Sequence, residues 1–205
     1  MKRIVIRAAR PALLVASLAV ATGCGSPPTN ARPGEGPVVC FGDSLTAGTG
    51  APQGRGYPSV LSDLLGEPVV NAGVPGDTTS SALARLERDV LAHDPRVVFI
   101  TLGGNDMMRD LAPEATERNL VEIVSRLHAT GALVVLGGIE LPIFGSGLAD
   151  AYDTVRDRTG CLLVDNVFAG IMGRPGMMSD RIHPSARGYE RLARTMYDAA
   201  SPHLD

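Results

Sequence analysis

The sequence predicts an α/β protein, a three-layer α/β/α sandwich built on a five-stranded parallel sheet. Five short apolar or β-branched runs alternate along the chain with longer segments whose apolar residues recur at helical spacing. This alternation favours a parallel sheet that helices cover on both faces. The length of 205 residues, 44% of them hydrophobic, suits one domain with a sizeable core.

The predicted strands carry Gly, Asn or Asp at or just after their carboxyl ends, and these residues disfavour continued strand. In chain order the strands are Val38–Phe41, Pro68–Asn71, Arg96–Leu102, Leu133–Leu136 and Cys161–Val164.

The predicted helices lie between these strands and after the last one, where apolar residues recur every three or four positions. In chain order they are Tyr57–Leu65, Ser80–Ala92, Glu114–Ala129, Leu148–Arg158 and Ala186–Ala200. In the second of them Leu83, Leu86 and Val90 fall on one face, as expected for a helix that packs on a sheet.

The N-terminus is typical of a secretory signal. Four basic residues within the first ten precede the apolar run 11–21, which is too short to span a bilayer as a mature helix. Cys24 directly follows the small Gly23, and this pattern resembles the bacterial lipobox, in which the cysteine is lipidated. The alternative is a plain signal peptide that is cut nearby. We therefore expect a signal peptide of lipoprotein type (1–23), a flexible Pro- and Gly-rich tether (24–36) and a folded domain (37–205).

Charge and composition exclude several function classes. Residues 1–23 hold four basic and no acidic residues, so their removal would change the formal net charge from −3 to −7. With no tryptophan and 4% aromatic residues, nucleic-acid binding has little support. Carboxylates and histidines are not clustered at ligand spacing, and no phosphate-loop motif is present. We expect no metal and no cofactor.

Polar residues follow the predicted strands, at the edge where open parallel sheets bind ligands. Ser44 comes just after the first strand, and two interpretations apply to it. It could cap a helix, or it could be a nucleophile, which needs a base, an orienting acid and donors for an oxyanion. Of the four histidines, His183 suits the base because it follows the last strand, with Asp180 three residues earlier.

Four short motifs in order resemble the sequence blocks of the GDSL/SGNH hydrolases, over roughly residues 38–200. The motifs are Gly42–Leu45, Gly76–Asp77, Gly103–Asp106 and Asp180–Pro184. The resemblance implies a flavodoxin-like SGNH fold with strand order 2-1-3-4-5. The segments around Asn71, Asp77 and 139–142 are most similar to the bacterial thioesterase I, lysophospholipase and arylesterase subgroup, which is periplasmic.

The resemblance also assigns roles to residues of this chain. Ser44 would be the nucleophile, His183 the general base and then acid, and Asp180 the residue that orients His183. The backbone N–H groups of Ser44 and Gly76 and the side-chain amide of Asn105 would form the oxyanion hole. The neighbouring Asp43, Asp77 and Asp106 are interpreted as structural acceptors that brace their turns.

The expected function is that of a serine esterase that cleaves carboxylic esters and thioesters through an acyl-enzyme, with acyl esters, aryl esters and lysophospholipid-like molecules as the expected small-molecule substrates. Met107, Met108, Ile143 and Phe144 are the predicted substrate-binding residues, since methionines offer an adaptable apolar wall. Arg109 could meet an anionic leaving group. A carbohydrate or peptidoglycan O-acetyl esterase and a non-enzymatic binding lipoprotein are the alternatives. The protein is expected to be a monomer, lipid-anchored through Cys24 in the bacterial periplasm or at the cell surface.

The two other cysteines, Cys40 and Cys161, are expected to be free thiols. In the strand order that the resemblance implies, two strands separate the first from the last, a spacing of roughly 14 Å at about 4.8 Å per step. A disulfide needs Cα atoms within about 7 Å.

Overall fold

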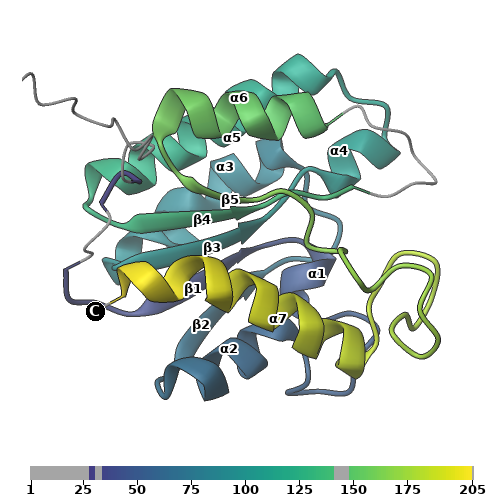
Figure 1. Ribbon diagram of the computed structural model, residues 1–205. Helices are drawn as coiled ribbons and strands as arrows, with labels where there is room; N and C mark the ends of the chain where they lie inside the picture. The colour runs from purple at the N-terminus through teal and green to yellow at the C-terminus, as the bar shows by residue number, and fades with distance from the viewer. Residues whose placement is uncertain (1–27, 31–33, 141–147, 205) are drawn as a thin grey trace, which may run out of the picture.

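The computed structural model describes residues 28–30, 34–140 and 148–204. A parallel five-stranded sheet forms the centre of the domain, with the strand order β2-β1-β3-β4-β5 (Figure 1). The strands are β1 (Val38–Gly42), β2 (Val69–Gly73), β3 (Val97–Thr101), β4 (Leu133–Gly137) and β5 (Leu162–Val164). The predicted sheet and strand order are confirmed.

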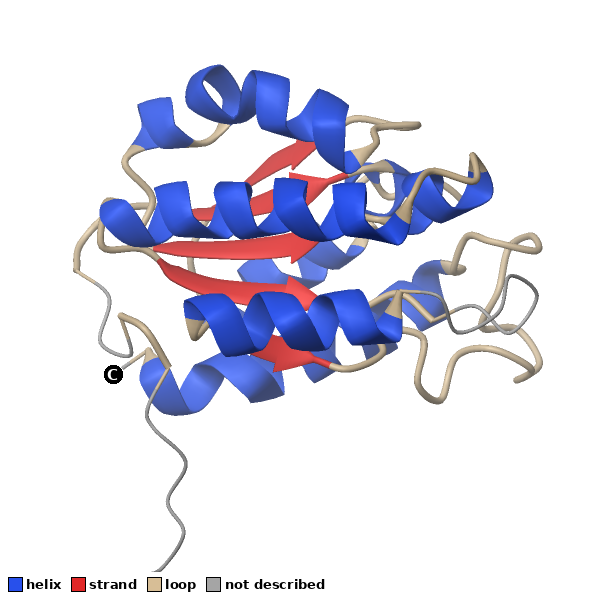
Figure 2. Ribbon diagram, turned by 90° about the horizontal axis from the view of Figure 1, so that it is seen from above, coloured by secondary structure: helices blue, strands red, loops and turns tan. Residues whose placement is uncertain are grey.

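Helices cover both faces of the sheet, which gives the predicted three layers (Figures 1 and 2). One face carries α3 (Thr79–Asp89), α5 (Pro113–Ala129) and α6 (Ala149–Thr159), and the other carries α2 (Tyr57–Leu65) and α7 (Ala186–Ala200). Every residue of β1, β3 and β4 is buried, because these central strands have neighbours on both sides and helices above and below.

Helix ends follow local chemistry. Thr78 and Ser81 form a reciprocal capping box at the start of α3. A proline begins α5, where its missing N–H costs nothing. Gly66 ends α2 in the left-handed conformation. The predicted ranges of α2 and α7 are confirmed residue for residue, and the others differ by one to three residues at their ends.

Short helices follow two of the central strands, and the sequence did not predict them. They are α1 (Ser44–Ala47) and α4 (Gly104–Met108). Two 3₁₀ turns, Leu91–His93 and Ser201–His203, extend α3 and α7. Four or five residues complete about one turn, which is too little for the apolar spacing of a helix to be recognised.

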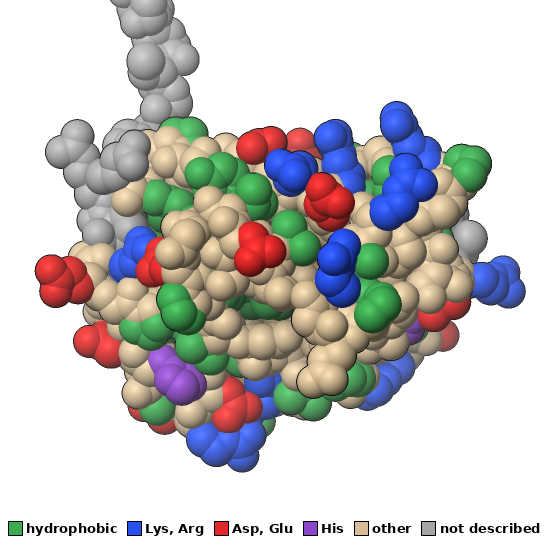
Figure 3. Space-filling model, turned by 90° about the horizontal axis from the view of Figure 1, so that it is seen from below, with side chains coloured by type: hydrophobic (Ala, Val, Ile, Leu, Met, Phe, Trp, Pro, Cys, Tyr) green, Lys and Arg blue, Asp and Glu red, His purple; other side chains and the backbone are tan. Residues whose placement is uncertain are grey.

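The last helix separates apolar and basic side chains. Tyr189, Leu192 and Met196 on its inner face are buried, and Arg187 and Arg191 lie on its outer side. Figure 3, which looks at the α2 and α7 side of the molecule, shows basic side chains gathered over part of this face. The apolar stripe therefore docks α7 on the sheet, and the arginines remain in solvent.

Two residues of the predicted flexible tether, Thr29 and Asn30, are hydrogen-bonded to the folded domain. The backbone N–H of Thr29 donates to Gly160 O (2.8 Å), and Asn30 Nδ2 donates to His128 O (3.1 Å) and Ala132 O (2.9 Å). These carbonyls precede β4 and β5, so residues 29–30 bind the domain at the amino-terminal edge of the sheet. The asparagine amide thereby connects the end of α5 with the residue that precedes β4.

Both cysteines within the described residues are buried and free. Cys40 lies on β1 and Cys161 just before β5, and β3 and β4 separate these strands. The prediction of two free thiols is confirmed. Burial raises the pKa of Cys161, which keeps its thiol protonated and unreactive.

Candidate active site

Asp43, and not Ser44, caps the short helix that follows the first strand. Asp43 is the N-cap of α1, and its Oδ1 accepts from the backbone N–H of Leu45 (2.9 Å). Ser44 is the first residue of the helix, so the interpretation of Ser44 as the cap is wrong. The interpretation of Asp43 as a structural acceptor is confirmed. Because Asp43 caps the helix, the Ser44 hydroxyl is available for another partner.

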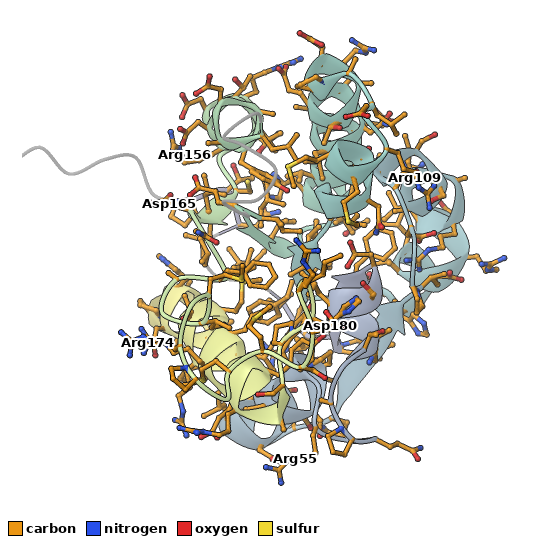
Figure 4. The ribbon with its side chains drawn as sticks, turned by 90° about the vertical axis from the view of Figure 1, so that its right-hand side faces the viewer. Arg55, Arg109, Arg156, Asp165, Arg174 and Asp180 are labelled. Atoms are coloured by element: carbon orange, nitrogen blue, oxygen red, sulfur yellow. The ribbon has the colours of Figure 1, made fainter. Side chains whose placement is uncertain are left out.

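His183 is that partner, and it connects Ser44 to Asp180. His183 Nε2 lies 3.0 Å from Ser44 Oγ, and His183 Nδ1 lies 2.8 Å from Asp180 Oδ2. The three residues come from the end of β1 and from the loop before α7. Figure 4 shows the loop with Asp180 beside α1 at the carboxyl-terminal edge of the sheet. The structure thus brings together the three residues that the sequence assigned to catalysis.

The Asp180 carboxylate is held by its own loop. Asp180 Oδ1 accepts from the backbone N–H groups of Ile182 (2.8 Å) and His183 (2.7 Å). The hydrogen bond from the His183 backbone, helped by those from the His183 ring and Ile182, lowers the pKa of Asp180 to about 2. At neutral pH a fixed negative charge therefore faces Nδ1 of His183. This favours the tautomer with the proton on Nδ1 and leaves Nε2 free to accept the proton of Ser44.

The loop after α1 packs against the His183 loop, and Gly50 makes this possible. Gly50 has φ +93°, and a Cβ atom there would lie 2.9 Å from His183 Cβ and 2.8 Å from Pro184 O. A side chain at this position would push the two loops apart, and the backbone angle also disfavours one. Tyr189 Oη donates to Thr49 O (2.7 Å) and fixes the same loop from α7. Sequence analysis missed Gly50, because a glycine in a loop carries no motif of its own.

Gly76 and Asn105 follow β2 and β3 and lie next to this centre. Gly76 has φ +84° and lies in a turn closed by a hydrogen bond from Asp77 N–H to Val74 O (3.1 Å). Asn105 Nδ2 donates to Asp43 Oδ2 (3.0 Å) and to Asp77 O (2.9 Å). The two bonds fix the orientation of the amide, and both of its N–H groups are engaged in the free protein.

The buried Asp43 carboxylate links the serine loop to Asn105. Burial raises the pKa of Asp43 to about 6, while the bond from Leu45 N–H, the charge of His183 and the amide of Asn105 oppose this shift. Above that pH the carboxylate is charged, and its hydrogen bonds to the amide and the backbone are of the stronger, charge-assisted kind. Asp43 therefore orients both the start of α1, which carries Ser44, and the side-chain amide of Asn105.

Asp106 connects more elements than the turn that the sequence assigned to it. Its Oδ2 accepts from Thr79 N–H (2.9 Å), and its Oδ1 accepts from Thr79 Oγ1 (2.5 Å) and Thr116 Oγ1 (3.2 Å). The side chain is 1% exposed and ties α4 to the starts of α3 and α5. Its role as a structural acceptor is confirmed. These connections hold Asn105, the preceding residue, at the site.

Exposed apolar side chains lie near Gly76 and Asn105 along the chain, in the loops after β2 and α4 and at the end of α4. Val74 is 41% exposed, Met108 36% and Leu111 41%. Met107 is half-buried against the core, so of the two predicted methionines Met108 is the more open to solvent. Ile143 and Phe144 lie outside the described residues. Val74 and Leu111 were not predicted, because a single apolar residue in a loop is common in any sequence.

An arginine lies beside the Gly76 turn. Arg109 Nη2 donates to Gly76 O (2.8 Å), and its side chain is exposed. Figure 4 shows Arg109 on the same side of the molecule as Asp180, over the carboxyl-terminal edge of the sheet. The guanidinium thus brings a positive charge to the rim of the site.

Comparison with known proteins agrees with this geometry. Residues 40–191 match the GDSL-like Lipase/Acylhydrolase family. Esterase TesA of Pseudomonas aeruginosa is 34% identical over 178 residues, which cover 82% of this chain and 89% of that protein. Thioesterase 1/protease 1/lysophospholipase L1 of Escherichia coli K12 is 36% identical over 173 residues, 80% of this chain and 83% of that protein.

A crystal structure of TesA superimposes on this chain with a TM-score of 0.77 at 32% identity, and the match covers 82% of this chain and 99% of that one. An acetylxylan esterase of Geobacillus stearothermophilus is 30% identical over 204 aligned positions, 78% of this chain and 92% of that protein. With the sheet order, the family match and these relatives in agreement, the chain belongs to the GDSL-like Lipase/Acylhydrolase family and is a hydrolase of the GDSL/SGNH esterase type.

Proposed function

We propose that the protein is a serine hydrolase that cleaves carboxylic esters and thioesters through an acyl-enzyme formed on Ser44. The observation that carries the proposal is the continuous series Ser44 Oγ, His183 and Asp180, joined at 3.0 Å and 2.8 Å. A hydroxyl is a weak nucleophile at neutral pH unless a base takes its proton during attack. This series supplies the base, and the carboxylate stabilises the imidazolium that forms.

The reaction follows from this arrangement. Ser44 Oγ attacks the acyl carbon while His183 Nε2 takes its proton, and the carbonyl oxygen becomes an oxyanion. Collapse of this intermediate breaks the ester or thioester bond, and His183 gives its proton to the departing alcohol or thiol. Water then attacks the Ser44 ester in the same way, with His183 again as base, and releases the carboxylic acid.

The oxyanion is stabilised by the backbone N–H groups of Ser44 and Gly76 and by Asn105. In the free protein Asn105 Nδ2 donates to Asp43 and to Asp77 O, so one of these hydrogen bonds is shared with the oxyanion when substrate is bound. The bond to the neutral carbonyl of Asp77 is the weaker one, because hydrogen bonds to charged acceptors are roughly twice as strong. We therefore infer that the Asn105 N–H that points to Asp77 O is the one that donates to the oxyanion when substrate binds.

The acyl chain of the substrate lies on the apolar side chains Val74, Met108 and Leu111, which surround the two oxyanion loops. Apolar surface removed from water contributes at most about 0.8 kcal/mol per methylene, so short to medium acyl chains gain from this surface. Arg109 at the rim suits a leaving group that carries a negative charge.

A second candidate is an O-acetyl esterase, which the relative named acetylxylan esterase favours. The two functions differ in how catalytic efficiency depends on the acyl chain. An acyl esterase with an apolar surface cleaves octanoyl esters faster than acetyl esters, whereas an O-acetyl esterase prefers acetyl and rejects octanoyl. Measuring kcat/KM over that series decides between them.

Labelling with a fluorophosphonate probe tests whether the protein is a serine hydrolase at all, since the probe phosphonylates activated serines. The wild type should be labelled at Ser44. Ser44→Ala should be folded and unlabelled, and Ser80→Ala, which changes an exposed serine on α3, should be labelled like the wild type. A folded wild type that resists the probe would instead support the non-enzymatic binding lipoprotein.

Lipidation of Cys24 and attachment to a membrane in the periplasm or at the cell surface are part of the proposal. Cys24 lies outside the described residues, and the support is the sequence pattern around it. Among the residues that the structure describes, no helix is long and apolar enough to cross a bilayer. Attachment through lipid chains needs no such helix.

A further inference from the structure

The sheet-facing side of α3 carries a buried arginine that the mechanism does not use. Arg85 is 9% exposed, and its helix neighbours Ala82 and Leu86 belong to the core. Arginine is almost never this buried without partners, because its charge and its N–H groups lose their water. The acceptors of the Arg85 hydrogen bonds therefore indicate which segments of the chain this side chain fixes in place.

Arg85 donates hydrogen bonds in four directions. Nε donates to Asp77 Oδ2 (2.5 Å), and Nη2 donates to Gly42 O (2.9 Å). Nη1 donates to Ala72 O (3.0 Å) and to Asp89 Oδ2 (3.1 Å). The guanidinium also lies 4.6 Å from the centre of the Phe41 ring, within the range of a cation–π contact.

Three of the four acceptors belong to segments that carry the proposed oxyanion donors. Gly42 ends β1, two residues before Ser44. Ala72 lies near the end of β2, and Asp77 directly follows Gly76. Asp77 O also accepts from Asn105 Nδ2 (2.9 Å), so the third donor is reached through the residue that Arg85 holds. One side chain thus links the segments of all three donors.

We propose that Arg85 is a positioning residue that sets the spacing of the oxyanion donors without touching the substrate. The proposal rests on the proposed function. Preorganised donors stabilise an oxyanion because they need not move as charge develops, and a shift of about 1 Å can cost about 100-fold in rate. The guanidinium is suited to this task, because it offers five N–H donors in a rigid plane, whereas lysine is a compact charge on a flexible stem.

Arg85→Lys tests the proposal while it keeps a cation beside Asp77. We expect kcat to fall by about 30- to 100-fold, with KM within about threefold of the wild-type value. An alkyl boronic acid forms a tetrahedral adduct on the serine, and its inhibition constant should rise by the same factor as kcat/KM falls. A side chain that acts only on stability would leave that constant unchanged in folded protein. If Arg85→Gln also folds, it should show the same pattern.

Arg96→Lys is the matched control. Arg96 is also a largely buried arginine, its side chain 18% exposed, and it pairs with Glu67 next to the start of β3, at the opposite edge of the sheet. This variant should lower the melting temperature without changing kcat or boronic acid inhibition by more than about twofold.

Folded Arg85→Lys with wild-type kcat and boronic acid inhibition would overturn the proposal, as would an equal loss of kcat in Arg96→Lys. Either result would leave the proposed function intact, because it requires an active wild type. A wild type that neither turns over esters nor reacts with the fluorophosphonate would contradict the proposed function first.

Discussion

At the scale of single residues, adjacent positions in Gly42–Leu45 perform different tasks. Asp43 caps α1 and orients Asn105, and this leaves the Ser44 hydroxyl to His183. A carboxylate beside the proposed nucleophile suggests a second catalytic acid, but Asp43 is buried, with 3% of its surface exposed. Its charge acts on the amide of Asn105 and on the backbone of α1.

The pKa of Asp43 predicts how stability depends on pH. Burial raises this pKa from 3.8 to about 6, so between about pH 4 and pH 6 the folded protein binds a proton that the unfolded chain has released. Folding is therefore favoured at the acidic end of this window, and the contribution is lost as pH rises through 6. Asp43→Asn cannot titrate and should lack this slope.

Urea unfolding of the wild type and Asp43→Asn at pH 4, 5, 6 and 7 measures the effect. Relative to the variant, the wild type should lose on the order of 1–3 kcal/mol between pH 4 and pH 7. A difference between the two proteins that is the same at all four pH values would show that the carboxyl titrates normally. Because an asparagine amide cannot accept at both positions, Asp43→Asn should also lower kcat through misorientation of Asn105.

The sequence predicted Ser44, Asp180 and His183 as one site because each follows a strand whose carboxyl end lies at the same edge of the sheet. The sequence could not show that Asn105 already uses both N–H groups, or that Arg85 supports the donors. Hydrogen bonds between segments far apart along the chain leave no pattern in it. A charged residue at a sheet-facing helix position is the one signal that points to Arg85.

At the scale of elements, α1 carries the proposed nucleophile and α4 carries one proposed oxyanion donor, although each helix is about one turn long. Neither has the length to be stable alone, and both depend on the strand ends where they begin. Asp43 supplies the N-cap of α1, and Asp106 within α4 binds α3 and α5. The longer helices were predicted from periodicity, and these two were missed because one turn has none. The proposed nucleophile and the Asn105 donor thus lie on the elements that the sequence predicts least well.

The end of α4 and the loop after it carry the exposed Met108 and Leu111, and this predicts how acyl length affects the rate. Met108→Ser should lower kcat/KM for hexanoyl esters by about 10-fold and leave acetyl esters within about twofold, since each buried methylene is worth at most about 0.8 kcal/mol. Val121→Ser, at a half-buried position of α5, is the control and should leave the dependence on acyl length unchanged. Equal losses on both substrates for Met108→Ser would show that the methionine supports the loop instead of binding the acyl chain.

At the scale of the whole molecule, residues 29–30 and the candidate active site lie at opposite edges of the sheet. Thr29 and Asn30 bind next to the starts of β4 and β5, whereas Ser44 follows the carboxyl end of β1. Figure 1 shows the described N-terminal residues, in purple, at the left and the loops after the strands at the right. Cys24 is five residues from Thr29, at most about 18 Å of extended chain. If Cys24 carries lipid, the site faces away from the membrane that holds it.

If Cys24 is lipidated, the anchored protein should cleave soluble esters as fast as the soluble Cys24→Ser form, and it should cleave lipid esters of its own membrane poorly. The test compares the anchored wild type in phosphatidylcholine vesicles with Cys24→Ser, using a soluble butyryl ester and a lysophospholipid held in the same vesicles or supplied in micelles. The Cys24→Ser variant should remain in the aqueous phase and should not partition into detergent. Fast cleavage of the vesicle lipid by the anchored form alone would contradict this orientation. An unmodified N-terminus elsewhere, found by mass spectrometry, would contradict lipidation.

The most direct test of the central claim is to trap the acyl-enzyme. Wild-type protein mixed with excess 4-nitrophenyl butyrate and quenched in acid within milliseconds should gain the mass of one butyryl group, on the peptide that contains Ser44. Ser44→Ala should gain none, and Ser44→Ala/His183→Ala should be no less active than Ser44→Ala alone, because the two residues act as a unit. An acyl group on another residue, or full turnover by folded Ser44→Ala, would contradict the assignment of Ser44 as the nucleophile.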